Sequence, residues 1–241
     1  HVTGQLVSKP YIDIPLNEMA KRGVRANWAD KAKIEIESNE YFKADEVAIE
    51  GDATAATYSS ALACIHQGRV TFTNLGKNTH QGDFKFFELL EQLGAKIQKT
   101  EHTTSVVGPA QLNALATVDM TDMPDAALTL IALAPLLPEK LLIAGLSSLH
   151  HKECDRLECP AKELSKLGIF SQTTQDTIQV KPISRDKILP GVVCSYHDHR
   201  MAMAFSLIGS VSGNISIDDK TVVNKTYPEF WKDYEKLLNN P

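Results

Sequence analysis

The chain has 241 residues, of which 43% are hydrophobic, and its formal net charge at pH 7 is −5. This length supports one large or two modest domains with a real core. The negative charge argues against nonspecific nucleic-acid binding, and neither a bilayer-spanning apolar run nor a signal-peptide pattern occurs, so we expect no nucleic-acid or membrane partner.

The four cysteines, Cys64, Cys154, Cys159 and Cys194, form no C-x-x-C pair, and the histidines do not complete a zinc pattern. We therefore expect no metal site. Reduced cysteines fit a cytoplasmic protein. The chain starts at His1 without an initiator Met, and we expect it to begin inside a longer polypeptide.

The first fifty residues predict a helix and two short strands. Apolar residues recur at helical spacing from Ile14 to Arg22, and Gly23 ends this run. Pro10 disfavours a helix at the residue before it, so the segment leading to the helix is expected to be extended. Lys33–Glu37 alternates with period two and predicts a strand, and Val47–Ile49 predicts another.

From about residue 46 the chain repeats itself. Asp52, Asp125 and Asp198 each open a helical run, and consecutive members are 73 residues apart (125 − 52 and 198 − 125). Each run is followed by a β-type segment and then by an amphipathic helix, and short strands follow the first two copies. The amphipathic helices are expected over Asp83–Leu93, Asp155–Leu167 and Pro228–Leu238.

This repetition predicts the fold class and the domains. We expect an α/β fold in which three β-α-β-α-β-β repeats pack as one domain, residues 46–241. Residues 1–45 are expected to be the end of a preceding, N-terminal domain.

An Asp at a helix start is typical of an N-cap, which satisfies a free backbone N–H group. Repeat packing also brings equivalent helix starts to one end of the domain, where they attract anions. The second and third copies add charged residues at that end, whereas the first offers only Lys77 and His80. The asymmetry predicts a site in copies two and three.

The stretch 149–157, Leu-His-His-Lys-Glu-Cys-Asp-Arg-Leu, has two readings. A run of charged residues is typical of a solvated turn that opens a surface helix. The alternative is a site that binds an anion through Lys152 and Arg156 and uses Glu153 for proton transfer.

Seven segments carry a resemblance to a known family. They are Leu-Val-Ser-Lys-Pro-Tyr-Ile-Asp (6–13), Glu-Gly-Asp-Ala-Thr (50–54), Gln-Gly-Asp (81–83), Asp-Met-Pro-Asp-Ala-Ala (122–127), His-Lys-Glu-Cys-Asp-Arg-Leu (151–157), Tyr-His-Asp-His-Arg-Met-Ala-Met (196–203) and Asn-Lys-Thr-Tyr-Pro-Glu-Phe (224–230). In type and order they resemble the motifs of the EPSP synthases, 3-phosphoshikimate 1-carboxyvinyltransferases, in the part that follows the family's first half.

The resemblance implies an enolpyruvyl transferase-like fold and a role in the shikimate pathway of aromatic amino acid biosynthesis. The family transfers the enolpyruvyl group of phosphoenolpyruvate to the 5-hydroxyl of shikimate 3-phosphate without a cofactor or metal. Asp125 would be the base that takes the hydroxyl proton, and Glu153 the acid that protonates the methylene carbon. Six further residues would bind the substrates. Shikimate 3-phosphate would be bound by Ser8, Ser148 and Lys152, and phosphoenolpyruvate by Arg156, Arg200 and Lys225.

Two positions depart from the family pattern. Ser148 stands where an Asn usually contacts the acceptor sugar, and His150 stands where an Arg is usual. The shorter reach of Ser148 weakens that one contact and leaves the proposed acid and base untouched.

Two alternative functions remain open at this level. One is the related enolpyruvyl transferase acting on UDP-N-acetylglucosamine. The other is a noncatalytic half that binds an anion or a partner chain. Because the motifs of the family's first half do not occur, we expect that half to be a partner of this chain, and the chain alone to be inactive.

Overall fold

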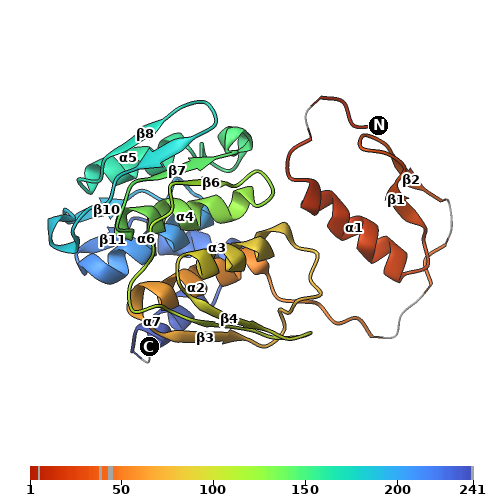
Figure 1. The fold of residues 1–241 in the computed structure, drawn as a ribbon, viewed down its shortest axis with the longest axis horizontal. Helices are drawn as coiled ribbons and strands as arrows, with labels where there is room; N and C mark the ends of the chain where they lie inside the picture. Colours follow the sequence, from red (N-terminus) through yellow and green to blue (C-terminus); the bar gives the residue numbers. More distant parts are fainter. Residues whose placement is uncertain (5, 38–39, 43–45, 240–241) are drawn as a thin grey trace.

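A computed structural model describes residues 1–4, 6–37, 40–42 and 46–239 (Figure 1). The N-terminal part forms helix α1 (Lys9–Lys21) and a two-stranded antiparallel sheet of β1 (Ala26–Trp28) and β2 (Ile34–Ile36), beside the rest of the molecule. The helix was expected only from Ile14. It begins earlier because Pro10 lies in its first turn, where the missing N–H group removes no hydrogen bond.

The prediction of a strand at Val47–Ile49 is wrong. This segment forms no strand, and the Ile49 side chain is 80% exposed. A strand needs a neighbour to complete its ladder, and among the described strands β3 (Arg69–Phe72) pairs only with β5 (Thr104–Val107). Strand β1 was not expected, because Ala26–Trp28 alternates over only three residues, fewer than the four to eight that predict a strand.

Three successive copies of a helix-and-sheet unit make up the rest of the chain. The first contains α2 (Ala53–His66), β3, α3 (Phe86–Gln92), β4 (Lys96–Lys99) and β5. The second contains β6 (Thr117–Asp119), α4 (Ala127–Leu133), β7 (Leu141–Ala144), α5 (Glu158–Lys166), β8 (Ser171–Thr173) and β9 (Ile178–Val180). The third contains β10 (Gly191–Val193), α6 (His199–Ser212), β11 (Ile215–Ile217) and α7 (Phe230–Asn239). The three expected amphipathic helices are confirmed as α3, α5 and α7.

Each copy contributes its own small sheet. The first is antiparallel, in the order β3-β5-β4, and the second is mixed, in the order β6-β7-β9-β8, with β6 parallel to β7. In the third, β10 runs parallel to β11, and the described residues show no closing hairpin after α7. The three copies therefore share the order of their helices, but their strands differ in number and pairing.

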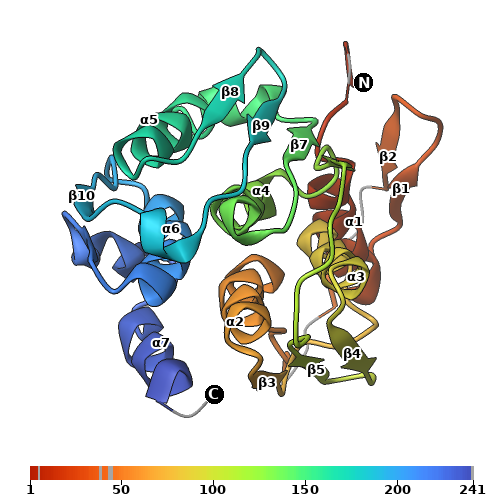
Figure 2. The ribbon, with the colours of Figure 1, turned by 60° about the vertical axis from the view of Figure 1, so that its left-hand side comes forward.

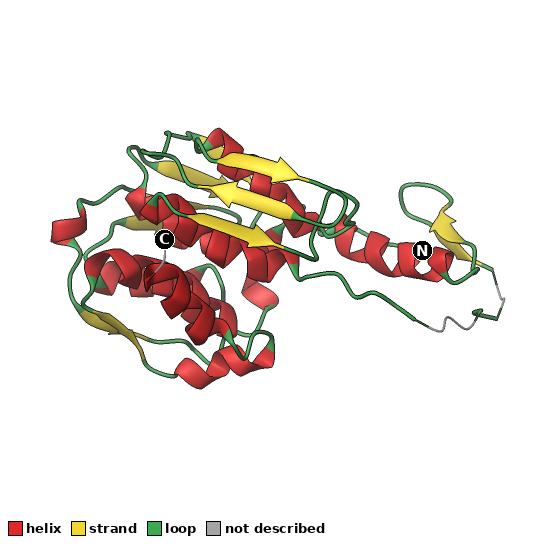
Figure 3. Cartoon of the chain, turned by 90° about the horizontal axis from the view of Figure 1, so that it is seen from below, coloured by secondary structure: helices red, strands yellow, loops and turns green. Residues whose placement is uncertain are grey.

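The helices α2, α4 and α6 pack against one another at the centre (Figure 2). They are buried along most of their length because small and apolar residues occupy every face. Met201 and Met203 of α6 are buried in this core. Viewed from below, the repeat strands lie outside these helices and α1 projects to one side (Figure 3).

Candidate active site

The three repeated aspartates do not play the same part. Asp52 caps α2 by accepting the amide of Thr54 at 2.8 Å, and Asp198 caps α6 by accepting the amide of Arg200 at 2.9 Å. Asp125 lies inside a 3-10 turn, η2 (Pro124–Ala126), which is capped by no side chain. Its carboxylate is therefore free to interact with other side chains.

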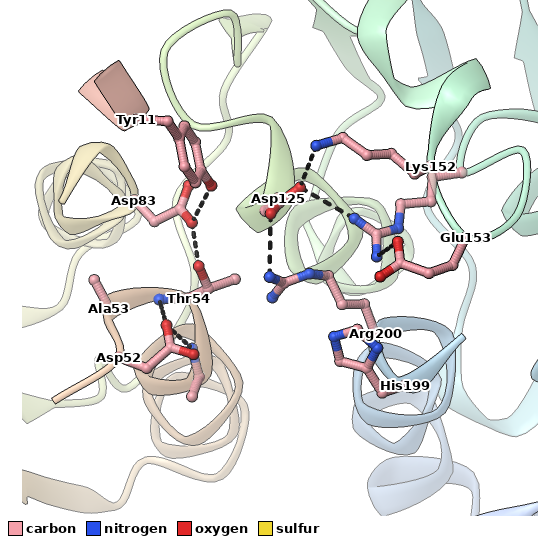
Figure 4. Close-up of polar contacts among 12 residues, drawn as sticks. Tyr11, Asp52, Ala53, Thr54, Asp83, Asp125, Lys152, Glu153, His199 and Arg200 are labelled. Carbon is pink, nitrogen blue, oxygen red and sulfur yellow. Dashed lines mark hydrogen bonds and ion pairs between the residues drawn. The ribbon is translucent and has the colours of Figure 1, made fainter. Parts of the chain in front are cut away.

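Asp125 lies among three cations (Figure 4). Its Oδ1 is 3.1 Å from Nζ of Lys152 and 3.0 Å from Nη1 of Arg156, and its Oδ2 is 3.1 Å from Nη2 of Arg200. Burial favours the neutral acid, but the charges of Arg200, Lys152 and Arg156 outweigh it and hold the pKa of Asp125 below its usual value. Asp125 is thus a carboxylate at neutral pH.

Arg156 joins the second and third copies. Its side chain is 2% exposed and donates to Asp198 from Nε at 2.7 Å and from Nη2 at 3.2 Å. It also donates to Oε2 of Glu153 at 2.7 Å. Asp198 is fully buried, and Arg156 and the start of α6 supply hydrogen-bond donors to its oxygens.

Glu153 lies between two cations. Besides Arg156, its Oε1 accepts a 2.5 Å bond from Nζ of Lys225, the last residue of η6 (Lys220–Lys225). Burial opposes ionisation, but the hydrogen bond from Lys225 and the charge of Arg156 lower the pKa of Glu153 to about 2. The acid expected from the sequence is therefore ionised in this state of the molecule.

Six of the eight site residues expected from the sequence come together. They are Asp125, Lys152, Glu153, Arg156, Arg200 and Lys225, hereafter the charged cluster. Ser8 and Ser148 are not joined to it by any hydrogen bond or ion pair of the described residues. Ser8 precedes α1 in a left-handed backbone conformation, and Ser148 lies in η4 (Ser147–His151), just before Lys152.

His150, one of the two departures, holds η4 in place. Its Nδ1 lies 2.9 Å from Oδ2 of Asp155, and its Nε2 lies 3.0 Å from the carbonyl of Gln175. Asp155 in turn accepts the amides of Leu157 and Glu158, as expected of a helix cap. The His150 side chain therefore fixes the loop that carries Lys152.

A second group of polar residues, beside the cluster, was not assigned a role from the sequence. The Tyr11 hydroxyl donates a 2.9 Å hydrogen bond to Oδ2 of Asp83, which also accepts from Thr54 (Figure 4). Gly82 permits this contact between α1 and the repeats, because a Cβ there would lie 2.7 Å from Cβ of Pro10. The only sequence signal was that Tyr11 and Asp83 stand within family-like motifs.

His199 also lies beside the cluster. It is 2% exposed, and neither ring nitrogen has a hydrogen-bond partner among the described residues. Burial and the nearby Arg200 charge lower the pKa of His199, which favours the neutral ring.

In the part of the chain that the structure describes, no three His, Cys, Asp or Glu side chains are grouped to hold a metal ion. Within the same ranges, no helix has the length and apolar character needed to cross a bilayer.

Residues 1–234 match the family described as EPSP synthase (3-phosphoshikimate 1-carboxyvinyltransferase). The 3-phosphoshikimate 1-carboxyvinyltransferase of Shewanella baltica is 37% identical over 238 residues, covering 98% of this chain and 55% of the relative. That of Trichormus variabilis is 34% identical over 237 residues, with 98% and 55% covered. The chain thus spans about half the length of the curated relatives it matches.

Solved structures agree in fold. The EPSP synthase of Acinetobacter baumannii superposes with a TM-score of 0.76 at 20% identity, over 91% of this chain and 53% of that one. The enolpyruvyl transferase NikO of Streptomyces tendae gives a TM-score of 0.71 at 14% identity, over 96% and 53%. With the family match over almost its whole length, the chain belongs to the EPSP synthase family.

Proposed function

We propose that this chain is part of an enzyme that transfers the enolpyruvyl group of phosphoenolpyruvate to the 5-hydroxyl of shikimate 3-phosphate. The observation that carries the proposal is the charged cluster, in which two carboxylates lie among cations from two copies of the repeat. Both substrates are polyanions and need such cations. The relatives that bear the name of this activity are about twice as long, so the proposal assigns activity to a complete enzyme.

In the proposed reaction Asp125 is the base. An alcohol is a poor nucleophile, and a positioned carboxylate that accepts its proton makes it a better one. As the 5-hydroxyl oxygen bonds to the substituted carbon of phosphoenolpyruvate, Glu153 gives a proton to the methylene carbon. Phosphate then departs, and a proton returns from the resulting methyl group to the Glu153 carboxylate, so the double bond of the enolpyruvyl group forms again in the product.

Glu153 serves as an acid only after its present partners release it. With Lys225 and Arg156 in place its pKa is about 2, far too low to hold a proton at neutral pH. A bound phosphoenolpyruvate would draw Arg156 to its carboxylate and Lys225 to its phosphate. Removing both donors and adding a negative ligand raises the pKa of Glu153, so substrate binding would prepare the acid.

The remaining assignments follow the chemistry of the ligands. The guanidinium groups of Arg156 and Arg200 match a carboxylate with two donors each. Lys152, next to Asp125, is assigned with Ser8 and Ser148 to shikimate 3-phosphate. We further propose that residues 1–45 end the first domain, that residues 46–241 form the second, and that the enzyme works in the cytoplasm.

The test is a phosphate-release assay with both substrates, run on this chain alone and mixed with a separately produced first half of a family member. We expect no turnover from the chain alone and measurable turnover from the mixture. In the mixture, Asp125→Asn should reduce turnover by roughly 10²–10⁴-fold. Asp52→Asn is the matched control, because Asp52 only caps a helix and Asn caps equally well.

Equal turnover of the Asp125→Asn and Asp52→Asn mixtures would contradict the role of Asp125 as base. The competing proposal, a noncatalytic anion-binding half, is favoured by one observation, which is that the chain spans about half of its relatives. It predicts phosphate binding by the chain and no turnover from any mixture.

A further inference from the structure

The turn that leads into α6 has an unusual backbone. Tyr196 and His197 have φ angles of 52° and 57°, and they are the only two successive non-glycine residues with positive φ in the described ranges. Side chains with a Cβ rarely adopt this conformation, and it persists only where the surroundings hold it. Contacts with neighbouring residues must therefore hold the backbone of residues 196–197 in this conformation.

The turn sets the position of the charged cluster. Asp198 follows it directly, is fully buried, and accepts two hydrogen bonds from Arg156. Asp198 also caps α6, and Arg200 is the second residue of that helix. A change in the backbone at 196–197 would therefore move both the carboxylate that orients Arg156 and the helix start that carries Arg200.

Glu163 on α5 holds the turn. Its side chain is fully buried, its Oε1 accepts a 2.6 Å hydrogen bond from the Tyr196 hydroxyl, and its Oε2 accepts a 3.1 Å bond from the amide of Cys194. Lys166 neutralises the same carboxylate at 2.7 Å. A buried carboxylate is costly unless its oxygens are satisfied, and here the donors come from the first residue of the turn, from Cys194 just before it and from α5 itself.

We propose that Glu163 is a positioning residue that, through the Tyr196 hydroxyl, fixes the left-handed turn at 196–197 and thereby sets Arg156 and Arg200 for binding the carboxylate of an anionic substrate. The substrate class rests on the proposed function. The positioning itself concerns only this chain's own side chains. Glu163 lies outside the charged cluster, and its effect reaches Arg156 through Asp198.

The experiment compares Tyr196→Phe with wild type in the 241-residue chain. Phosphoenolpyruvate affinity is measured by calorimetry, and the Arg156 Nε–H signal by NMR. Loss of the hydroxyl is expected to weaken binding by roughly tenfold, the lower end of the value of a hydrogen bond to a charged group. It should also shift the Arg156 signal, which reports the bond to Asp198. Tyr234→Phe is the matched control, because it removes a hydroxyl that donates to the carbonyl of Ser206, away from the turn.

A rescue separates positioning from general stability. His197 is exposed, and glycine adopts positive φ without strain, so His197→Gly added to Tyr196→Phe should recover most of the affinity and the wild-type Arg156 signal. Glu163→Met, which keeps the length of the side chain but removes both acceptor oxygens, should resemble Tyr196→Phe. An unchanged Arg156 signal in Tyr196→Phe, or an equal shift in Tyr234→Phe, would overturn the inference.

The NMR arm needs no ligand. It therefore remains decisive if the wild-type chain alone fails to bind phosphoenolpyruvate, a ligand whose binding the proposed function assigns to a complete enzyme. If wild type binds and Tyr196→Phe binds equally well, the positioning role is wrong and the proposed function stands. A loss of affinity without recovery in the double variant would show a merely structural effect and also overturn the inference.

Discussion

Lys225 and Glu153, 72 residues apart in the sequence, form a 2.5 Å ion pair that connects the third copy to the second. The pair has a pH signature. The pKa of Glu153 in the folded chain, about 2, lies below its ordinary value of 4.5, so its stabilisation is present above pH 4.5 and is lost as the pH falls toward 2.

Glu153→Gln is therefore expected to lower the free energy of unfolding at pH 7 by about 1 kcal/mol, a modest value because the carboxylate is partly exposed. The difference from wild type should shrink between pH 4.5 and pH 2. Urea unfolding at several pH values measures it. Glu229→Gln, in the exposed pair with Lys232, should have almost no effect and serves as the control. A difference that grew in acid would contradict the assigned shift.

Asp125→Asn is expected to strengthen the binding of inorganic phosphate by the chain, although it should remove turnover in a complete enzyme. The substitution removes the carboxylate that now pairs with Lys152, Arg156 and Arg200, so an added anion meets less competition. Calorimetric titration with phosphate at low salt measures the change. Weaker binding than wild type would mean that Asp125 organises the cations more than it competes for them.

Arg156→Ala is expected to destabilise the chain far more than Arg200→Ala. Removing Arg156 takes from the buried Asp198 the cation that pairs with it at 2.7 Å, and breaking such a pair costs roughly 3–5 kcal/mol. Adding Asp198→Asn should recover part of this loss, since a neutral amide tolerates burial better. Urea midpoints of the three variants decide the point. Equal midpoints for the two arginine variants would contradict this account.

In a complete enzyme Arg200→Ala is expected to weaken phosphoenolpyruvate binding more than shikimate 3-phosphate binding. It removes a charge-assisted contact worth roughly 1.5–3 kcal/mol, which is about tenfold or more in affinity. Separate calorimetric titrations with the two ligands measure the contrast. Equal losses would argue against contact between Arg200 and the phosphoenolpyruvate carboxylate.

Tyr11→Phe is expected to loosen α1 from the repeats. The Tyr11 hydroxyl donates to the buried Asp83, and loss of that bond should speed amide exchange in α1 by about tenfold or more while α2 keeps its protection. Hydrogen exchange read by mass spectrometry resolves the two helices. Lys9→Gln is the control, because Lys9 pairs with Asp13 within α1 itself. Unchanged exchange in α1 would show that other contacts hold it.

The central helices were predictable because their signal is local and repeated. The 73-residue spacing of Asp52, Asp125 and Asp198, with the small and apolar residues that follow, marks the same helix three times. The short strands carry weaker signals. Ala26–Trp28 forms a strand because β2 lies opposite and pairs with it. Val47–Ile49 has the composition of a strand, but no neighbouring strand among the described residues pairs with it.

The arrangement of the site could be predicted only in part. Family-like motifs pointed to the members of the charged cluster, but its pairings join residues up to 75 positions apart, beyond any local pattern. The sequence suggested a cap for each repeated Asp, yet Asp125 caps nothing and Asp198 also binds Arg156. Glu163 lies in an amphipathic helix where a polar residue is ordinary, and only the fold shows that it is fully buried.

The ion pairs within the charged cluster also affect how many negative charges a ligand needs in order to bind there. Each of its four cations already has a carboxylate partner, so an anion binds by displacing an internal counter-ion. A chloride or acetate ion offers one charge, too little to replace contacts that are held within one folded chain. A ligand with several charges on one skeleton can replace several at once, because its later contacts are intramolecular. We therefore expect the acidic residues of the charged cluster to favour polyvalent over monovalent anions.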